Sequence, residues 1–157
     1  MNAEHCEPQL DVMKLGDVDE VLAIERESFL TPWSRFAFLS ELLENERAVY
    51  LVARCNGRVA GYVGMWRVAD EGHITNLAVH PAFRRRGVGR TLLGAICDLA
   101  EAQRLARMTL EVRVSNINAQ RLYESFGFAS AGIRPGYYQD NNEDAIIMWR
   151  DNNQSES

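Results

Sequence analysis

The chain has 157 residues, of which 17 are basic and 22 acidic, giving a net charge of -5 at pH 7. This length suits one domain with its own core, and a content of 46% hydrophobic and 25% charged residues is typical of a globular protein, not a disordered or fibrous one. The acidic balance argues against a general binder of nucleic acid or anionic membranes, so neither partner is expected.

The cysteines and histidines predict no disulfide framework and no metal centre. Cys6, Cys55 and Cys97 are odd in number and form no C-x-x-C pair, so we expect reduced thiols in a cytoplasmic protein. The histidines lack the spacing of metal ligands, and no metal is expected. No secretory signal is recognisable at the N-terminus, and no apolar run is long enough to span a bilayer.

Strand and helix patterns alternate across residues 10–150, which we expect to form one domain between loose tails at 1–9 and 151–157. The predicted order is a strand, two helices, three strands, a helix, a strand, a helix and two strands. Hairpin strands followed by a strand–helix–strand–helix unit predict an α/β (α+β) fold. Its sheet is mixed and mostly antiparallel, with helices on both faces.

The first half is predicted to hold two helices and a hairpin. Asp17 can cap the first helix and Ser34 the second, whereas Asn56-Gly57 is typical of a type I′ turn. The expected elements are a strand at 10–15, a helix closing in the stretch SFLTPW, a helix at 34–45, and strands at 48–55, 59–68 and 73–80. The second helix carries one expected buried stripe, made of Phe36, Leu39, Leu42 and Leu43.

The second half is predicted to alternate helix and strand. A helix begins near Val88, a strand with alternating side chains covers 107–114, a helix covers 116–126, and a strand covers 143–150. Gly127 is a fitting stop for the second of these helices.

The stretch HPAFRRRGVGRTLLG, residues 80–94, places four arginines around two glycines at a predicted helix start. A helix N-terminus offers N–H groups and partial positive charge to an anion, glycines let phosphate approach the backbone, and arginines add charge-assisted contacts. The alternative is a solvated loop with a plain glycine turn. A P-loop is excluded because no lysine is present, and a Rossmann fingerprint because Leu92 stands where its third glycine belongs.

The motif R-x-x-G-x-G from Arg84 to Gly89 resembles the acetyl-CoA pyrophosphate loop of the GNAT N-acetyltransferase superfamily. The resemblance covers about residues 10–150. It implies the GNAT fold, acetyl-CoA as cosubstrate, and a preceding strand whose backbone pairs with the pantetheine arm. The cofactor-binding residues that it implies here are Leu77, Ala78, Val79, Arg84, Arg85, Arg86, Gly87, Val88, Gly89 and Arg90.

Glu111 and Tyr123 are the candidate catalytic residues. Glu111 lies in mid-strand among apolar neighbours, where a carboxylate needs a partner or a task. The structural alternative is a salt bridge to Arg113 or to another arginine of the sheet, and for Tyr123 it is a core position. Together, a carboxylate and a phenol can remove a proton from an attacking amine and give one to a departing thiolate.

The segment LEVRVSNINAQRLYESFGF, with NEDAIIMWR near the end, resembles the RimI-type branch of GNAT, which acetylates the N-terminal alanine of a small-subunit ribosomal protein. The resemblance implies that Glu111 is the general base, Tyr123 the general acid, and Asn116 a ligand of the pantetheine arm. It also implies that FLTPWS and IRPGYYQDN are loops flanking the acceptor peptide, with Trp33, Tyr137 and Tyr138 as substrate-binding residues.

An α-amine is the favoured acceptor because it loses its proton more easily than a lysine side chain does. Its pKa of about 7.7–8.0 makes deprotonation at pH 7 cost about 1 kcal/mol, against about 4–5 kcal/mol for a lysine. The sequence therefore predicts an acetyl-CoA-dependent peptide α-N-acetyltransferase. The rivals are a GNAT enzyme acting on lysine or a small amine, and a non-catalytic acyl-CoA-binding module.

Overall fold

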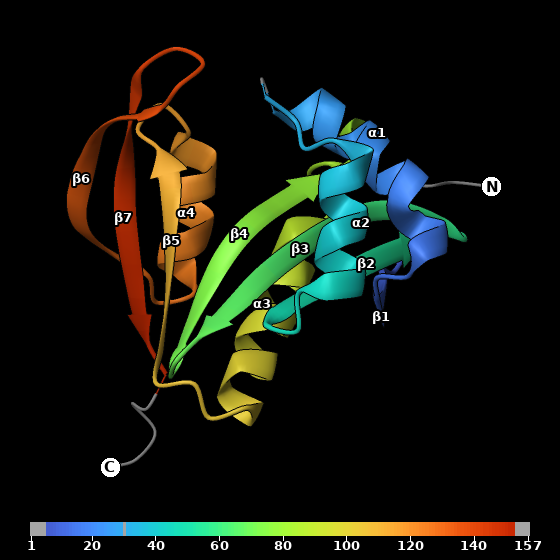
Figure 1. Cartoon of the computed structure of the whole chain (residues 1–157), viewed down its shortest axis with the longest axis horizontal. Coiled ribbons are helices and arrows are strands. Elements are labelled where there is room, and N and C mark those ends of the chain that lie inside the picture. The colour runs from blue at the N-terminus through green and yellow to red at the C-terminus, as the bar shows by residue number, and fades with distance from the viewer. Residues whose placement is uncertain (1–5, 30, 153–157) are drawn as a thin grey trace. The chain divides into compact units, whose positions relative to one another are not determined.

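The computed structural model describes residues 6–29 and 31–152, and its elements follow the predicted order (Figure 1). They are β1 Gln9–Val12, α1 Val18–Ser28, α2 Arg35–Glu44, β2 Ala48–Cys55, β3 Arg58–Val68, β4 Glu71–Val79, α3 Val88–Ala102, β5 Arg107–Arg113, α4 Ile117–Ser125, β6 Ala129–Tyr138 and β7 Glu143–Asp151, with 3-10 helices at Leu15–Asp17 and Pro81–Phe83. The outer parts of the two expected tails, residues 1–5 and 153–157, lie outside the described residues.

Hydrogen bonds join the strands in the order β1-β2-β3-β4-β5-β7-β6. The pairs β1–β2, β2–β3, β5–β7 and β6–β7 are antiparallel, whereas β4 and β5 are parallel over three residue pairs, Glu71↔Arg107 to His73↔Thr109. The predicted mixed and mostly antiparallel sheet is confirmed.

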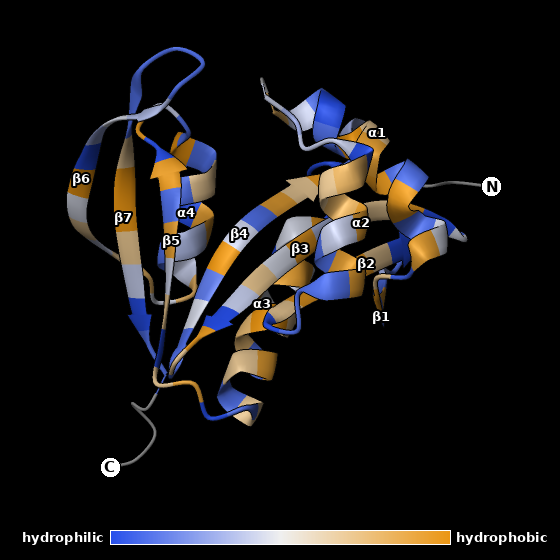
Figure 2. Cartoon of the chain, in the orientation of Figure 1, coloured by the Kyte–Doolittle hydropathy of each residue, from blue (hydrophilic) through white to orange (hydrophobic). Residues whose placement is uncertain are grey.

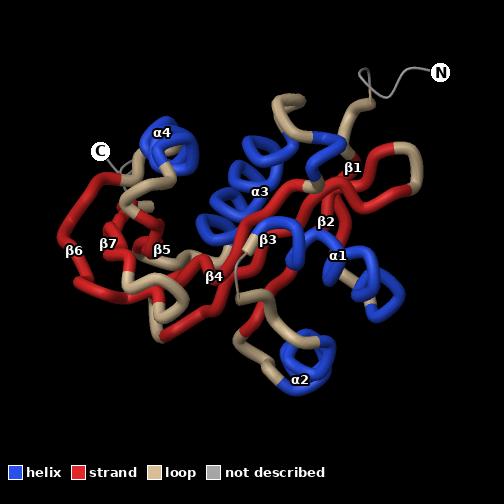
Figure 3. The backbone as a smooth tube through the Cα atoms, turned by 90° about the horizontal axis from the view of Figure 1, so that it is seen from above, coloured by secondary structure: helices blue, strands red, loops and turns tan. Residues whose placement is uncertain are grey.

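The described residues divide into two compact units, of which the first contains residues up to 66 together with 75–97. Within it, α1 and α2 cover one face of β2 and β3, and α3 covers the other (Figures 1 and 3). Hydrophobic and hydrophilic positions alternate along β4, as expected for a strand (Figure 2). The core of the first unit includes the fully buried Ile24, Phe38, Val52 and Tyr62.

The second unit contains residues 67–74 and those from 98 onward. Strands β5, β7 and β6 form its sheet, and α4 follows β5 along the chain. Met108, Leu110 and Met148 are buried at its centre. Gly127, the residue after the C-cap of α4, has φ +92°, which is the left-handed conformation expected of a glycine helix stop.

The Ser34 cap and the Asn56-Gly57 turn are confirmed, whereas Asp17 stands at the N-cap position of α1 without a side-chain capping bond. The predicted stripe on α2 is right for Leu39 and Leu42, which pack against the core, and wrong for Phe36 and Leu43. The Ser34 hydroxyl accepts from the Ala37 N–H as an N-cap. Phe38 is fully buried, whereas Phe36 is 78% exposed and Leu43 is 66% exposed. Apolar residues occur on several sides of this helix, so its periodicity does not decide which side packs on the sheet.

The segment 133–141, expected as a loop, is a strand as far as Tyr138. Pro135 cannot donate to a ladder, but it lies in an edge strand where the register shifts between Arg134 and Tyr138. Edge strands and bulges tolerate proline. The glycine and proline signals of this segment therefore mark a bulged edge strand.

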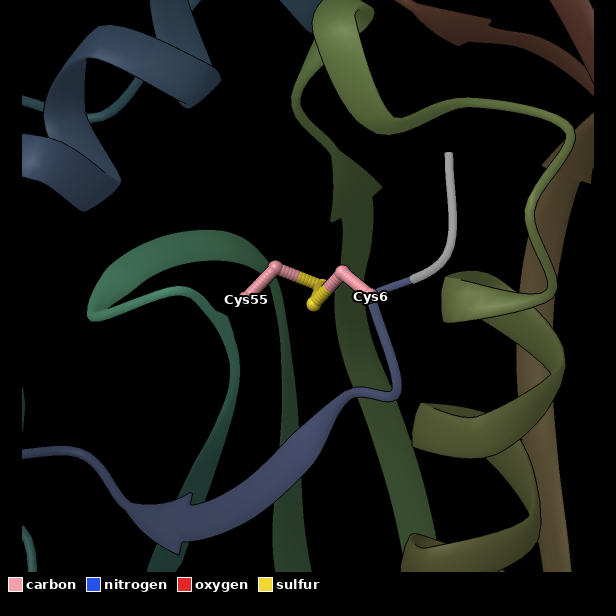
Figure 4. The surroundings of a disulfide bond; sticks show 2 residues. All are labelled: Cys6 and Cys55. Atoms are coloured by element: carbon pink, nitrogen blue, oxygen red, sulfur yellow. A yellow bond between two sulfur atoms is a disulfide. The ribbon is translucent and has the colours of Figure 1, made fainter. Parts of the chain in front are cut away.

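The expectation of reduced cysteines is wrong in the structure, because Cys6 and Cys55 form a disulfide (Figure 4). Their Cα atoms are 5.6 Å apart although 49 residues separate them in sequence. Cys6 leads into β1, and β1 pairs with β2, whose last residue is Cys55. Strand pairing thus brings together two cysteines that no sequence motif connects.

Reduction of this disulfide is expected to lower the free energy of unfolding by about 2–4 kcal/mol, because a cross-link over 49 residues restricts the unfolded chain. Urea unfolding with and without a thiol reductant measures the difference. Cys6→Ser serves as the control, since its stability should not respond to the reductant. Equal responses of the two proteins would contradict the prediction.

Candidate active site

The arginine–glycine segment enters α3 in the first unit. Arg84, Arg85 and Arg90 are exposed. Arg85 has φ +64° and Gly87 has φ +81°, so the backbone bends twice through the left-handed region before Val88 begins the helix. This bend favours glycine at position 87. The predicted helix start is confirmed, and exposed guanidinium groups flank it.

Phe83 and His80 anchor this segment, and neither was singled out from the sequence. Phe83 is 3% exposed, and the guanidinium carbons of Arg58 and Arg86 lie 5.6 and 6.0 Å from its ring centre. The His80 N–H donates to the Ala60 carbonyl at 2.7 Å. These contacts hold the start of the loop against β3.

The β4 backbone next to the loop is closely packed. Ala78 is buried, while Leu77 and Val79 are half-buried. The Val79 carbonyl accepts from Nε of Arg84 at 3.1 Å. A Cβ at Gly61 would stand 2.8 Å from the Ala78 oxygen, so only glycine fits there. Arg84 therefore ties the loop to β4.

Glu111 lies on β5 in the second unit, opposite Ile147 of β7. Its side chain is 26% exposed, and its Oε2 lies 3.5 Å from Nε of Arg134 on β6. Of the two structural alternatives, the partner is thus another arginine of the sheet and not Arg113. A pair of this length, with Arg134 half exposed, is a weak contact.

Tyr123 on α4 is 8% exposed, and its ring packs edge-on against Phe128 at 5.9 Å. Burial raises the pKa of Tyr123, and Tyr138 adds to the shift. The phenol therefore keeps its proton at neutral pH. This environment suits a proton donor and a packed core residue alike.

Tyr138 has aromatic and charged neighbours in the second unit. Its ring meets that of Tyr137 at 5.0 Å. Burial raises the pKa of Tyr138 to about 12. The Arg113 charge acts to lower this pKa, whereas Tyr137 and Glu111 act to raise it. The structure thus brings Glu111, Tyr137 and Tyr138 within electrostatic range of one another, and Tyr123 within range of Tyr138.

Arg113, considered from the sequence only as a partner of Glu111, organises the turn between β6 and β7. Its guanidinium carbon lies 4.0 Å from the Tyr138 ring centre. Its nitrogens pair with Asp140 at 2.6 Å and with Glu143 at 3.2 Å. The Ser115 N–H donates to the second oxygen of Glu143 at 2.8 Å. Arg113 therefore holds Tyr138 in place.

Acid is expected to weaken this turn. Hydrogen bonds from Ser115, followed by that from Arg113, lower the pKa of Glu143 from 4.5 to about 2. A lowered folded-state pKa contributes stability above pH 4.5 that is lost as pH falls toward 2. The melting temperature of Glu143→Gln should therefore be lower than that of wild type at pH 7. The difference between the two melting temperatures should become smaller toward pH 3. A gap independent of pH in calorimetric melts would contradict this account.

Asn116 and Trp33 have structural partners of their own. Asn116 caps α4, with its Oδ1 accepting from the Ala119 N–H at 3.2 Å, so the side-chain NH₂ is the donor it can offer to a ligand. The Trp33 ring, half-buried in the first unit, packs against Phe38 at 5.0 Å and Tyr50 at 6.5 Å.

Residues 6–29 and 31–152 contain neither a cluster of metal ligands nor a membrane-spanning helix. No group of three or more histidine, cysteine, aspartate or glutamate side chains is gathered as metal ligands there. No helix in these ranges combines the length and the apolar character needed to cross a membrane.

Comparison with known proteins identifies the family. Residues 18–128 match the model of the acetyltransferase (GNAT) family. The chain belongs to the GNAT acetyltransferase family. It is therefore an acetyltransferase by family, and the predicted GNAT fold is confirmed.

Two curated GNAT relatives cover most of the chain. A Bacillus subtilis protein named "Putative ribosomal protein bS18-alanine N-acetyltransferase" is 48% identical over 137 residues, which are 87% of this chain and 91% of the relative. The ribosomal protein bS18-alanine N-acetyltransferase of Escherichia coli K12 is 40% identical over 138 residues, 87% of this chain and 92% of the relative. The RimI-type resemblance is confirmed.

Solved GNAT structures agree with the fold. The ribosomal-protein-S18-alanine N-acetyltransferase from Escherichia coli superimposes with a TM-score of 0.85 at 37% identity, covering 92% of this chain and 94% of that one. Ard1 from Thermoplasma volcanium gives a TM-score of 0.84 at 29% identity, covering 92% and 97%.

Proposed function

We propose that this GNAT enzyme transfers the acetyl group of acetyl-CoA to the N-terminal α-amine of a protein, and that its acceptor is the N-terminal alanine of a small-subunit ribosomal protein. The observation that carries the proposal is the 48% identity to the Bacillus subtilis relative over 91% of its length. The 40% identical Escherichia coli relative bears the same activity in its name.

The first unit has the features that acetyl-CoA needs. Exposed Arg85 and Arg90 flank the N-terminus of a 15-residue helix, which favours an anion. Gly87, with positive φ and open space where a Cβ would stand, lets a pyrophosphate reach the backbone. The β4 backbone at Leu77 and Val79 is the proposed partner of the pantetheine amides.

The second unit has the groups that the acyl transfer needs. Glu111 takes a proton from the amine, directly or through water, so that the nitrogen lone pair can attack the thioester carbonyl carbon. When the carbon–sulfur bond breaks, Tyr123 gives its proton to the departing thiolate. Burial keeps on the Tyr123 phenol the proton that this role requires.

Aromatic side chains are the proposed acceptor contacts in both units. Trp33 follows α1 in the first unit, and Tyr137 and Tyr138 end β6 in the second. We propose that the protein acts in the cytoplasm, and the ribosomal acceptor named for its relatives supports this. Disulfides are rare in cytoplasmic proteins, so the Cys6–Cys55 bond is an exception to the usual pattern of that compartment.

Thiol release from acetyl-CoA tests the proposed function. The protein is assayed with a peptide beginning with alanine, the same peptide blocked at its N-terminus and carrying an internal lysine, and a panel of small amines. The proposal expects turnover with the free N-terminus. Turnover with the other amines alone indicates the rival GNAT activity, and binding without turnover indicates a non-catalytic module.

Coenzyme binding is expected to depend on the loop. Gly89→Asp should raise the Kd for CoA at least about tenfold, because it adds bulk and negative charge in the first turn of α3. Gly16→Asp is the matched control, since it adds the same charge where a Cβ meets nothing within 4 Å. Calorimetric titration measures both. If pantetheine bound as tightly as CoA, the proposed binding of phosphate by the arginine–glycine loop would be contradicted.

A further inference from the structure

Glu25 is a buried carboxylate that the proposed chemistry does not use. It lies in α1 and is 2% exposed, although α1 has solvent-facing positions for its other acidic residues. A buried carboxylate is costly unless hydrogen bonds satisfy its oxygens. Its partners therefore indicate what it does.

The two oxygens of Glu25 bond two different segments. The Tyr62 hydroxyl of β3 donates to Oε1, and the Trp33 backbone N–H donates to Oε2 at 2.9 Å. Tyr62 is itself fully buried, and burial together with the Glu25 charge raises its pKa, so it remains the donor. The Asn76 side chain of β4 partly opposes this rise in the Tyr62 pKa.

These contacts form a continuous path within the first unit. It runs from Tyr62 on β3 through Glu25 to the backbone of Trp33. Ser34 then caps α2. Glu25 thus fixes the chain at the point where it leaves α1 and turns into α2.

Fold stability alone does not account for a carboxylate here. Replacing buried ionic groups by well-packed apolar ones is often neutral or stabilising, because the desolvation cost disappears. An apolar residue, however, could not accept from the Trp33 N–H and the Tyr62 hydroxyl at once. The carboxylate is needed where the position of the segment matters.

We infer that Glu25 is a positioning residue that sets the segment 31–34, with Trp33, for the first residue of the acceptor. Glu25 acts through Tyr62 and the Trp33 backbone and does not touch the reacting atoms. The inference rests on the proposed function, in which Trp33 contacts the acceptor. It predicts an effect on acceptor binding and not on coenzyme binding.

Steady-state kinetics of Glu25→Gln test the inference. The amide offers one acceptor oxygen where two donors need one each, so the KM for the alanine-first peptide should rise roughly tenfold. The Kd for acetyl-CoA should stay within about twofold. Tyr62→Phe, which keeps the ring packed on Phe38, should shift the KM in the same direction by less.

Glu20→Gln is the matched control. Glu20 lies on the same helix, and its Oε2 accepts from the Val59 N–H at 2.9 Å, away from Trp33. This variant should leave the peptide KM unchanged. A peptide KM unchanged in Glu25→Gln, or raised equally in Glu20→Gln, would overturn the inference.

Amide hydrogen exchange gives a readout that does not depend on turnover. Exchange at the Trp33 N–H should be faster in Glu25→Gln and unchanged in Glu20→Gln. Unchanged exchange in Glu25→Gln would overturn the inference even if activity fell. Failure of the proposed function is seen separately, as a wild type that acetylates no peptide α-amine, and it would remove the inference with it.

Discussion

Tyr123→Phe is expected to lower kcat by about 100- to 10,000-fold, the usual range for loss of a general acid. The variant keeps the ring that packs on Phe128 but removes the proton that the thiolate needs. The affinity for acetyl-CoA should change little, because the phenol is not a phosphate contact. Steady-state assays of thiol release measure the decrease in kcat.

The control is Tyr138, a half-buried tyrosine of the same unit. Tyr138→Phe should alter the peptide KM more than kcat, because Tyr138 is held by Arg113 as a proposed acceptor contact. A folded Tyr123→Phe protein with wild-type kcat would return Tyr123 to a packing role. Thermal melts of both variants establish that they fold.

Glu111→Gln is expected to lower kcat/KM by about 100- to 10,000-fold at pH 7, with part of the loss recovered above about pH 8. The recovery follows because more of the peptide α-amine is already neutral at high pH and needs no base. Rate–pH profiles of the variant and wild type with the alanine-first peptide measure this difference.

Arg134→Gln separates catalysis from the ion pair. If the Glu111–Arg134 contact were the reason for the carboxylate, both substitutions would lower the melting temperature alike and neither rate defect would recover with pH. The catalytic account expects Arg134→Gln to retain most of the activity. Equal rate losses in the two variants would contradict it.

The sequence predicted those parts of the fold that local chemistry decides. Asp17 and Ser34 mark helix starts, Asn56-Gly57 adopts the positive φ angles of a hairpin turn, and Gly127 ends a helix. Each signal acts within a few residues, so one chain contains enough information. The order of elements follows from such signals.

Contacts between distant residues were not predictable in this way. Cys6 reaches Cys55 only because β1 pairs with β2. The buried side of α2 is decided by the sheet beneath it, which selects Phe38 over Phe36. Local periodicity does not contain this information.

In the candidate site, too, some residues could be predicted from the sequence and others could not. Glu111 and Tyr123 were singled out as residue types in a recognisable segment. Arg113 and Glu25 were not assigned their partners, because Asp140, Glu143, Tyr62 and Trp33 come from other elements of their units. Supporting residues of this kind become visible only when the strands and helices are in place.

The central claim is that the enzyme acetylates an N-terminal α-amine. It is tested most directly by tandem mass spectrometry of one peptide that begins with alanine and also contains a lysine, after incubation with the protein and acetyl-CoA. We predict a single acetyl group on the alanine nitrogen. An acetyl group on the lysine side chain, with the N-terminus unmodified, would contradict the account.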